Sequence, residues 1–354
     1  TIPTNGSFTA TKAWVDGPKP LDEVRFQLYR NIAGGTKAAV GSPVGLTESS
    51  YTWNNLQETD INGNAYIYSF EESTVPANYT ASYSEDGLTV TNTYTIPTNG
   101  SFTATKAWVD GPKPLDEVRF QLYRNIAGGT KAAVGSPVGL TESSYTWNNL
   151  QETDINGNAY IYSFEESTVP ANYTASYSED GLTVTNTYTI PKRDITVTKE
   201  WVNGPETHPT IEIQLYRSIE REMTPEMAIQ SIEELVGTIS LQNGDESYTW
   251  SDMDVTDTYG NLYEYYVVEV TTFNGYAVSY SEDRLTIINK AKEFNVAYNS
   301  NGGSGTMNDD NSPYKYGSQV TILQNVYTRS GYNFTGWNTA ADGNGTSYAA
   351  GNEF

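Results

Sequence analysis

The sequence predicts an all-β protein built from tandem β-sandwiches and a smaller β domain. Residues 1–94 and 95–188 are identical letter for letter, and a divergent third copy extends from 189 to about 290. Each copy holds six or more short strand-like segments separated by turn residues, which is typical of a sandwich of immunoglobulin-like size. Tyrosine, threonine, asparagine and glycine are frequent, and they favour short strands and tight turns.

The first copy shows these segments in order. Val24, Phe26 and Leu28 alternate onto one face, which we expect to lie in the core. Asp-Gly and Asn-Gly pairs between segments are strong hairpin signals. The expected turns are Asp16-Gly17-Pro18, Asn62-Gly63 and Asp86-Gly87. The expected strands cover residues 7–14, 23–30, 50–56, 65–72, 79–86 and 88–94.

The third copy is longer in its middle, where we expect a short helix near residues 224–236. Thr224 suits the N-cap, Pro225 suits the first helical position and Gly237 suits the end of the helix. One helical face would carry Ala228, Ile232 and Leu235. A helix of this size usually covers part of a core, and a partner-binding site is the alternative interpretation.

Residues 291–354 follow a different pattern and predict a separate small domain. Segments such as "EFNVAYNSNGG" and "GYNFTGWNT" do not match the copies before them. The chain stops at "GNEF", which we expect to fall short of the last strand of this domain. Because the chain starts at a "TIP" joint like those between copies, we also expect it to be cut from a longer array.

Composition excludes several classes of protein. The 354 residues carry a formal net charge of −23, which argues against binding nucleic acid or anionic membrane surfaces. No apolar run approaches the length of a membrane span. Cysteine is absent and His208 is the one histidine, so we expect no disulfide, no histidine-based catalytic triad, no metal and no cofactor.

The duplication favours a mechanical role. Catalysis does not require the same domain twice in a row, whereas a stalk gains length from each added copy. The joints "TNTYTIPTNG" and "TNTYTIPKRD" are short and carry one proline each, and such linkers act as semi-rigid spacers. The sequence therefore predicts an extended monomeric rod rather than an enzyme.

Three strands of each copy place one polar residue on an otherwise apolar face. Lys12 lies on that side of "FTATKAW", Glu72 on that of "AYIYSFEE" and Asn92 on that of "LTVTNTY". The set persists in the divergent third copy, with the same 20-residue spacing from glutamate to asparagine. The corresponding residues are Lys106, Glu166 and Asn186 in the second copy, and Lys199, Glu269 and Asn289 in the third.

A lone buried lysine would be costly, so the lysine needs a partner. Two chemical arrangements of the three residues would supply one. The first is a non-covalent buried Lys–Glu–Asn network. The second is a covalent bond, since burial lowers a lysine pKa and raises a glutamate pKa. A neutral Lys12 amine could then attack the side-chain carbonyl of Asn92, while protonated Glu72 polarises that carbonyl and passes protons to the leaving ammonia. The product would be an intramolecular Lys–Asn isopeptide bond.

The motifs around these residues resemble a known family. The opening "T-x-T-K-x-W", the segment "Y-x-x-x-E" and the closing "L-T-V/I-x-N" look like the Cna-B-type repeat domains of Gram-positive collagen-adhesin and pilin proteins, over residues 1–290. The resemblance implies an immunoglobulin-like sandwich with reversed strand order. It also implies a self-formed bond between the first-strand lysine and the last-strand asparagine, promoted by the glutamate, in all three copies.

The last segment resembles a second family. "YNSNGGSGT" and "GYNFTGWNTAADGNGTSYAAG" are similar to the Listeria–Bacteroides repeat of internalin-type surface proteins. This resemblance implies a small β-grasp-like module, and it implies no catalytic or binding residues.

Two other patterns have competing interpretations. Residues 60–71 space oxygen atoms like a calcium loop, but the glycine is misplaced and the third copy loses the ligands, so a hairpin turn is favoured. Four tryptophans recur at equivalent positions and could stack on sugars, although core packing is the preferred interpretation. They are Trp14, Trp53, Trp201 and Trp250.

The sequence as a whole predicts a stalk segment of a bacterial cell-surface adhesin or pilin-like protein, outside the cell and associated with the cell wall. Its only chemistry would be autocatalytic, single-turnover isopeptide formation, with no partner required and host proteins or glycans contacted through other regions. A ligand-binding adhesin module that contacts a host protein or glycan directly is the alternative. The expected domains are 1–94, 95–188, 189–290 and 291–354.

Overall fold

The computed structural model describes residues 2–221 and 230–354. The chain forms two compact units, Thr1–Val109 with Lys113–Tyr188, and Asp110–Pro112 with Thr189–Phe354. The described residues form strands and two single-turn 3-10 helices, and they contain no α-helix. None of their helices has the length and apolar character needed to cross a membrane. The predicted all-β class is confirmed.

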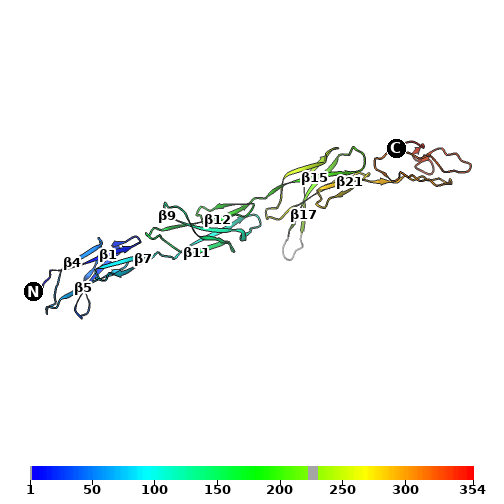
Figure 1. Cartoon of the computed structure of the whole chain (residues 1–354). Coiled ribbons are helices and arrows are strands. Elements are labelled where there is room, and N and C mark those ends of the chain that lie inside the picture. The colour runs from blue at the N-terminus through cyan, green and yellow to red at the C-terminus, as the bar shows by residue number, and fades with distance from the viewer. Residues whose placement is uncertain (1, 222–229) are drawn as a thin grey trace. The chain divides into compact units, whose positions relative to one another are not determined.

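In the first copy, seven strands form two sheets (Figure 1). One sheet has the order β4-β1-β7-β6, and the other has the order β3-β2-β5. The first and last strands, β1 and β7, pair in parallel in the middle of their sheet, and all other pairs are antiparallel. The elements are β1 (Gly6–Val15), η1 (Leu21–Glu23), β2 (Arg25–Ile32), β3 (Ala38–Gly45), β4 (Ser50–Leu56), β5 (Tyr66–Thr74), β6 (Tyr79–Tyr83) and β7 (Thr89–Tyr94).

The second and third copies repeat this topology. Their four-stranded sheets have the orders β11-β8-β14-β13 and β18-β15-β21-β20, and their three-stranded sheets have the orders β10-β9-β12 and β17-β16-β19. The second copy contains β8 (Gly100–Val109), η2 (Leu115–Glu117), β9 (Arg119–Ile126), β10 (Ala132–Gly139), β11 (Ser144–Leu150), β12 (Tyr160–Thr168), β13 (Tyr173–Tyr177) and β14 (Thr183–Tyr188). The third contains β15 (Lys192–Val202), β16 (Ile211–Arg221), β17 (Gln230–Leu241), β18 (Ser247–Asp254), β19 (Glu264–Glu269), β20 (Tyr276–Tyr280) and β21 (Thr286–Ala291).

The core of each copy lies between its two sheets. In the first copy, Val24, Phe26 and Leu28 are fully buried, as their alternation predicted. Phe70 packs against Phe26 across β5 and β2, with ring centroids 4.7 Å apart. Full burial of a side chain of this size contributes about 1.5–3 kcal/mol. The polar residue Lys12 therefore points into a layer from which water is excluded.

The strand β3 is an element that the sequence pattern did not reveal. Its residues "AAVGSPVG" alternate poorly and include glycine and proline. It lies at the edge of its sheet and pairs with β2 through an irregular register between Phe26 and Leu28. Edge strands tolerate proline and glycine because one side of the strand forms no ladder.

The prediction of a helix near residues 224–236 is wrong for the part of this segment that the structure describes. Residues 224–229 lie outside the described residues, and 230–236 belong to β17, which pairs antiparallel with β16. Ile232 and Leu235, expected on one apolar helical face, are 41% and 48% exposed. The partner strand pairs with residues 230–235 before a register shift at Val236, and this tertiary pairing outweighs a weak local helical signal.

The C-terminal module, residues 291–354, is built mostly from turns. Two short ladders, β22-β23 and β24-β25, and two isolated bridges connect it internally. Ala291 ends β21 of the third copy, and beyond it the buried apolar residues are Val320 and Ile322. The strands are β22 (Glu293–Phe294), β23 (Tyr314–Lys315), β24 (Trp337–Asn338) and β25 (Ser347–Tyr348). A β-grasp-like arrangement for this module stays a prediction.

Candidate functional site

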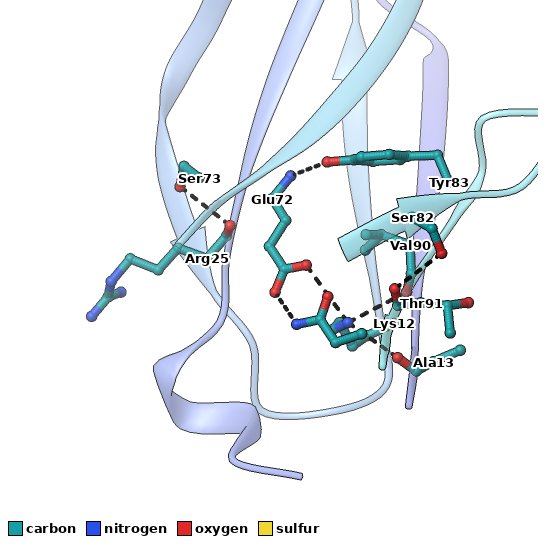
Figure 2. Close-up of polar contacts among 10 residues, drawn as sticks. Lys12, Ala13, Arg25, Glu72, Ser73, Ser82, Tyr83, Val90 and Thr91 are labelled. Carbon is teal, nitrogen blue, oxygen red and sulfur yellow. Dashed lines mark hydrogen bonds and ion pairs between the residues drawn. The ribbon is translucent and has the colours of Figure 1, made fainter. Parts of the chain in front are cut away.

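The structure brings the lysine, glutamate and asparagine of the first copy together. In the parallel pairing of β1 with β7, Lys12 lies opposite Val90 and Trp14 lies opposite Asn92, so the lysine and the asparagine are near neighbours on the inner face of one sheet. Glu72 belongs to β5 of the other sheet. Figure 2 shows the side chains of Lys12 and Glu72 pointing toward each other between the sheets.

The three side chains are in contact and shielded from water. Asn92 Nδ2 donates to Glu72 Oε1 at 2.8 Å, and Lys12 Nζ lies 3.6 Å from Glu72 Oε2. The side chains of Lys12 and Glu72 are both 0% exposed, and Asn92 is fully buried. One carboxylate oxygen therefore faces the amine and the other faces the amide nitrogen.

The other two copies have the same geometry. In the second copy, Asn186 Nδ2 donates to Glu166 Oε1 at 2.8 Å, and Lys106 Nζ lies 3.6 Å from Glu166 Oε2. In the third, the corresponding distances are 2.9 Å from Asn289 to Glu269 and 3.7 Å from Lys199 to Glu269. The third copy has diverged in sequence, so its agreement is more informative than that of the identical second copy.

Backbone and aromatic groups hold the lysine in place. Lys12 Nζ donates to the carbonyl of Ala13 at 3.1 Å and to that of Val90 at 3.4 Å, and it lies 4.4 Å from the ring centroid of Trp14. Trp14 and Trp53 also pack against the core of the first copy. The recurring tryptophans thus pack against the cores, as preferred from the sequence, and Trp14 and Trp201 also lie beside the lysine of their copy.

Tyr83 is a supporting residue that the sequence analysis missed. Its hydroxyl accepts a hydrogen bond from the backbone N–H of Glu72 at 2.8 Å (Figure 2). Tyr280 makes the same contact with Glu269 in the third copy, again 11 residues after the glutamate. That constant spacing in two divergent copies was the available signal.

Burial shifts the two titratable groups in opposite directions. Removal from water lowers the pKa of Lys12, although the charge of Glu72 opposes this. Burial also raises the pKa of Glu72, opposed by the hydrogen bond from Asn92 and the charge of Lys12. In the third copy, burial lowers the pKa of Lys199 to about 8. These directions favour a neutral amine beside a neutral carboxyl.

The site leaves two acceptors unsatisfied in every copy. Glu72 Oε2 and Asn92 Oδ1 are buried and accept no hydrogen bond from the described residues. A buried unsatisfied polar atom costs about 1–3 kcal/mol. As a purely non-covalent network, the arrangement would carry this cost in full at the asparagine oxygen of each copy, three times in one chain, while the lysine charge offsets part of it at the glutamate oxygen.

The segment that resembled a calcium loop is a hairpin turn. Asp60 Oδ1 accepts hydrogen bonds from the backbone N–H groups of Asn62 and Asn64, and Asp60 Oδ2 accepts one from the Asn64 side chain. Gly63 supplies the positive φ of 85° that the turn requires. Within the described ranges, no group of three or more acidic, histidine or cysteine side chains is placed to hold a metal ion.

Fold and site together define a class of protein: tandem immunoglobulin-like β-sandwiches that each bury one lysine, glutamate and asparagine between their sheets. The sequence profile of the Cna protein B-type domain matches residues 8–93, 102–187 and 195–290. These segments make up more than half of the chain, which therefore belongs to the Cna protein B-type domain family. The Listeria–Bacteroides repeat domain matches residues 294–354. Both resemblances found in the motifs are confirmed.

Known relatives include surface proteins of Gram-positive bacteria. The collagen adhesin of Staphylococcus aureus is 27% identical over 337 residues, covering 89% of this chain and 26% of that protein, so the chain spans about a quarter of its relative. A solved pair of B repeat units from the collagen-binding protein of the same organism is 24% identical, with 82% of this chain and 76% of that chain covered and a TM-score of 0.34. The shaft pilin SpaA of Lactobacillus rhamnosus GG is 14% identical, with 52% and 98% covered and a TM-score of 0.21.

Proposed function

We propose that this chain is a stalk segment of an adhesin or pilin-like protein on the surface of a Gram-positive bacterium. Its three Cna B-type domains would each be cross-linked by a self-formed isopeptide bond between lysine and asparagine. The observation that supports this proposal best is the buried Lys–Glu–Asn contact. It recurs in the divergent third copy with the same two unsatisfied acceptors. A covalent bond relieves the burial cost that a non-covalent network would keep.

The geometry supports a defined sequence of proton and bond changes in the first copy. The neutral Lys12 amine attacks the side-chain carbonyl carbon of Asn92, and a C–N bond forms. Glu72 Oε2 faces the attacking nitrogen and is placed to take its proton. Glu72 Oε1 faces the amide nitrogen of Asn92, so the same carboxyl can return a proton to the leaving group. Ammonia departs, the amide C–N bond breaks and Glu72 is regenerated.

The position of the bond explains a mechanical role. It would join β1 to β7, the first and last strands of the first copy, which are already parallel neighbours. Because force enters and leaves the domain through these strands, a covalent link between them would bypass the remaining strands. Pulling would then leave the sandwich folded, and local opening that exposes cleavage sites to proteases would be suppressed.

Intact-mass spectrometry of the unmodified chain tests this function. If all three bonds form, the chain is lighter than its sequence by three ammonia molecules. Substituting Asn92→Ala should restore one ammonia mass and leave the other two bonds intact. A mass equal to that of the sequence would overturn the covalent proposal.

The alternative function, direct contact with a host protein or glycan, has its own test. Immobilised host matrix proteins and glycans are probed with the whole chain and with a chain that lacks residues 291–354. A stalk segment should bind none of them. Specific binding that disappears with residues 291–354 would assign the adhesive role to the C-terminal module instead.

A further inference from the structure

A turn near the end of β1 connects the first and second copies within the first compact unit. We call Asp16-Gly17-Pro18 the docking turn. Gly17 N–H donates to the carbonyl of Ile155 at 2.9 Å, and the hydroxyls of Tyr94 and Thr153 are 2.7 Å apart. Residues 153–157 of the second copy, which receive these contacts, form what we call the acceptor turn.

Glycines make the close approach between these turns possible. A Cβ atom at Gly157 would lie 2.6 Å from Cδ of Pro18, and a Cβ atom at Gly17 would lie 2.2 Å from the hydroxyl oxygen of Tyr79. Both glycines have positive φ, 87° and 70°. Pro18 therefore packs directly on the backbone of Gly157, where a side chain would collide with it, and the missing side chain at Gly17 lets the docking turn pack on Tyr79 of its own copy.

The same contact recurs in the second unit with a partner from a different family. There the turn Asn203-Gly204-Pro205 of the third copy meets the C-terminal module. A Cβ atom at Gly317 would lie 2.6 Å from Cδ of Pro205, and Lys315 Nζ donates to Asn203 Oδ1 at 3.0 Å. Gly317 also has a positive φ, 81°. The docking turn of the first copy and its counterpart in the third copy thus both pack on a glycine in a tight turn, although the two partner domains belong to different families.

The first copy carries an acceptor turn of identical sequence at residues 59–63, and it is open. Ile61 is 87% exposed, whereas its counterpart Ile155 is 45% exposed. Apart from its two chain neighbours, no described residue has an atom within 4 Å of a Cβ placed on Gly63. Asp60 already holds the turn in shape through its hydrogen bonds, so the surface is formed before anything binds.

We propose that residues 59–63 of the first copy are a docking site for the Gly-Pro turn and last-strand tyrosine of a further repeat joined in tandem ahead of it. The occupied acceptor turn of the second copy, identical in sequence, identifies this partner. A separate chain is a poorer partner, because the docking turns of its first and third copies are already engaged within their own units. So small a contact also needs the high effective concentration that a short linker provides.

Thiol labelling of an extended chain tests the proposal. The chain has no cysteine, so Ile61→Cys introduces a single thiol whose reaction rate with a bulky maleimide reports its accessibility. The whole chain is compared with one that has an added copy of residues 1–94 joined ahead of residue 1. We expect labelling to slow at least about twofold in the extended chain, reaching the rate of Ile155→Cys in the original chain. An unchanged rate would overturn the proposal.

A matched substitution separates docking from local strain. Gly63→Val in the extended Ile61→Cys chain should block the docking turn and restore fast labelling. In the original chain the same substitution carries the same backbone strain but meets open space, so it should leave the rate unchanged. Sedimentation of the original chain should show monomers, and concentration-dependent association abolished by Gly63→Val would assign the site to a second chain instead. Neither readout depends on the isopeptide bonds, which the mass measurement tests.

Discussion

Two consecutive glutamates in β5, Glu71 and Glu72, form ion pairs that differ in exposure to water and in distance. Glu71 points outward and meets Lys37 at 2.7 Å, with the two side chains 52% and 39% exposed. Glu72 points inward and lies 3.6 Å from Lys12, with both side chains 0% exposed. The shorter contact is the weaker one, because water screens exposed charges and competes for their hydrogen bonds. Environment rather than distance decides what each pair can do.

The comparison also explains where chemistry can arise. The Lys37–Glu71 pair lies in solvent, so burial does not perturb it in the way that it perturbs the inner pair. Burial lowers the pKa of Lys12 and raises that of Glu72, which is the pairing that an uncharged nucleophile and a proton donor need. Burial therefore makes the inner pair costly to maintain, and it is also the condition on which the proposed reaction depends.

The largest effect should come from removing the inner carboxyl. Glu72→Ala leaves Lys12 buried without its partner, which costs about 3–5 kcal/mol, and it also prevents the cross-link of the first copy. Denaturant unfolding should show a destabilised first copy, and the intact mass should rise by one ammonia relative to the bonded chain, after correction for the substitution. Glu71→Ala is the control in the same strand. Equal loss of stability in both variants would abolish the distinction between the pairs.

A pH dependence should appear once the bond is prevented in the third copy. Asn289→Ala leaves Lys199 free, with its folded pKa lowered from 10.5 to about 8 by burial. Below pH 8 the lysine is protonated in both states and its burial penalty is complete. Between about 8 and 10.5 the unfolded state binds more protons, so stability should rise with pH. Unfolding curves across this range measure the rise.

The matched control for that prediction removes the titrating group. A chain with both Lys199→Met and Asn289→Ala should lose the increase in stability between pH 8 and 10.5. The unmodified chain should also lack it, because an amide-linked lysine does not titrate. An identical increase in all three chains would show that other groups cause it.

A smaller effect is expected at the tyrosine that supports the inner glutamate. Tyr83→Phe removes the acceptor for the Glu72 N–H and should cost about 1 kcal/mol, with the bond still formed. Unfolding of this variant is compared with Tyr51→Phe, a substitution of an exposed tyrosine on the same copy. A loss no greater than that of Tyr51→Phe would mean that the hydroxyl contact does not stabilise the strand.

The smallest effect should come from the outer pair. Lys37→Met removes the contact with Glu71 and should change the unfolding free energy by less than about 1 kcal/mol. The change should shrink further in added salt, because exposed ion pairs are screened. A loss comparable with that of Glu72→Ala would contradict the conclusion drawn from exposure.

The repeated architecture and the members of the candidate site can be inferred from the order of the residues alone. Period-two alternation assigned Val24 and Phe26 to the core, because successive residues of a strand face opposite sides. The same rule identified Lys12, Glu72 and Asn92 as polar residues on otherwise apolar strand faces. The divergent third copy showed that the set persists. These features are local and repetitive, so they can be read without knowing the partners of each strand.

The pairing of the strands and the contacts of each side chain, in contrast, become known only from the folded chain. Residues 230–236 belong to a strand because β16 pairs with most of them, and β3 is a strand at an edge where its proline is tolerated. The contact of Tyr83 with Glu72 likewise joins two different strands, and that of Gly17 with Ile155 joins two different copies. Local propensity has no information about such partners, because their stabilisation comes from surfaces that meet only after the chain has folded.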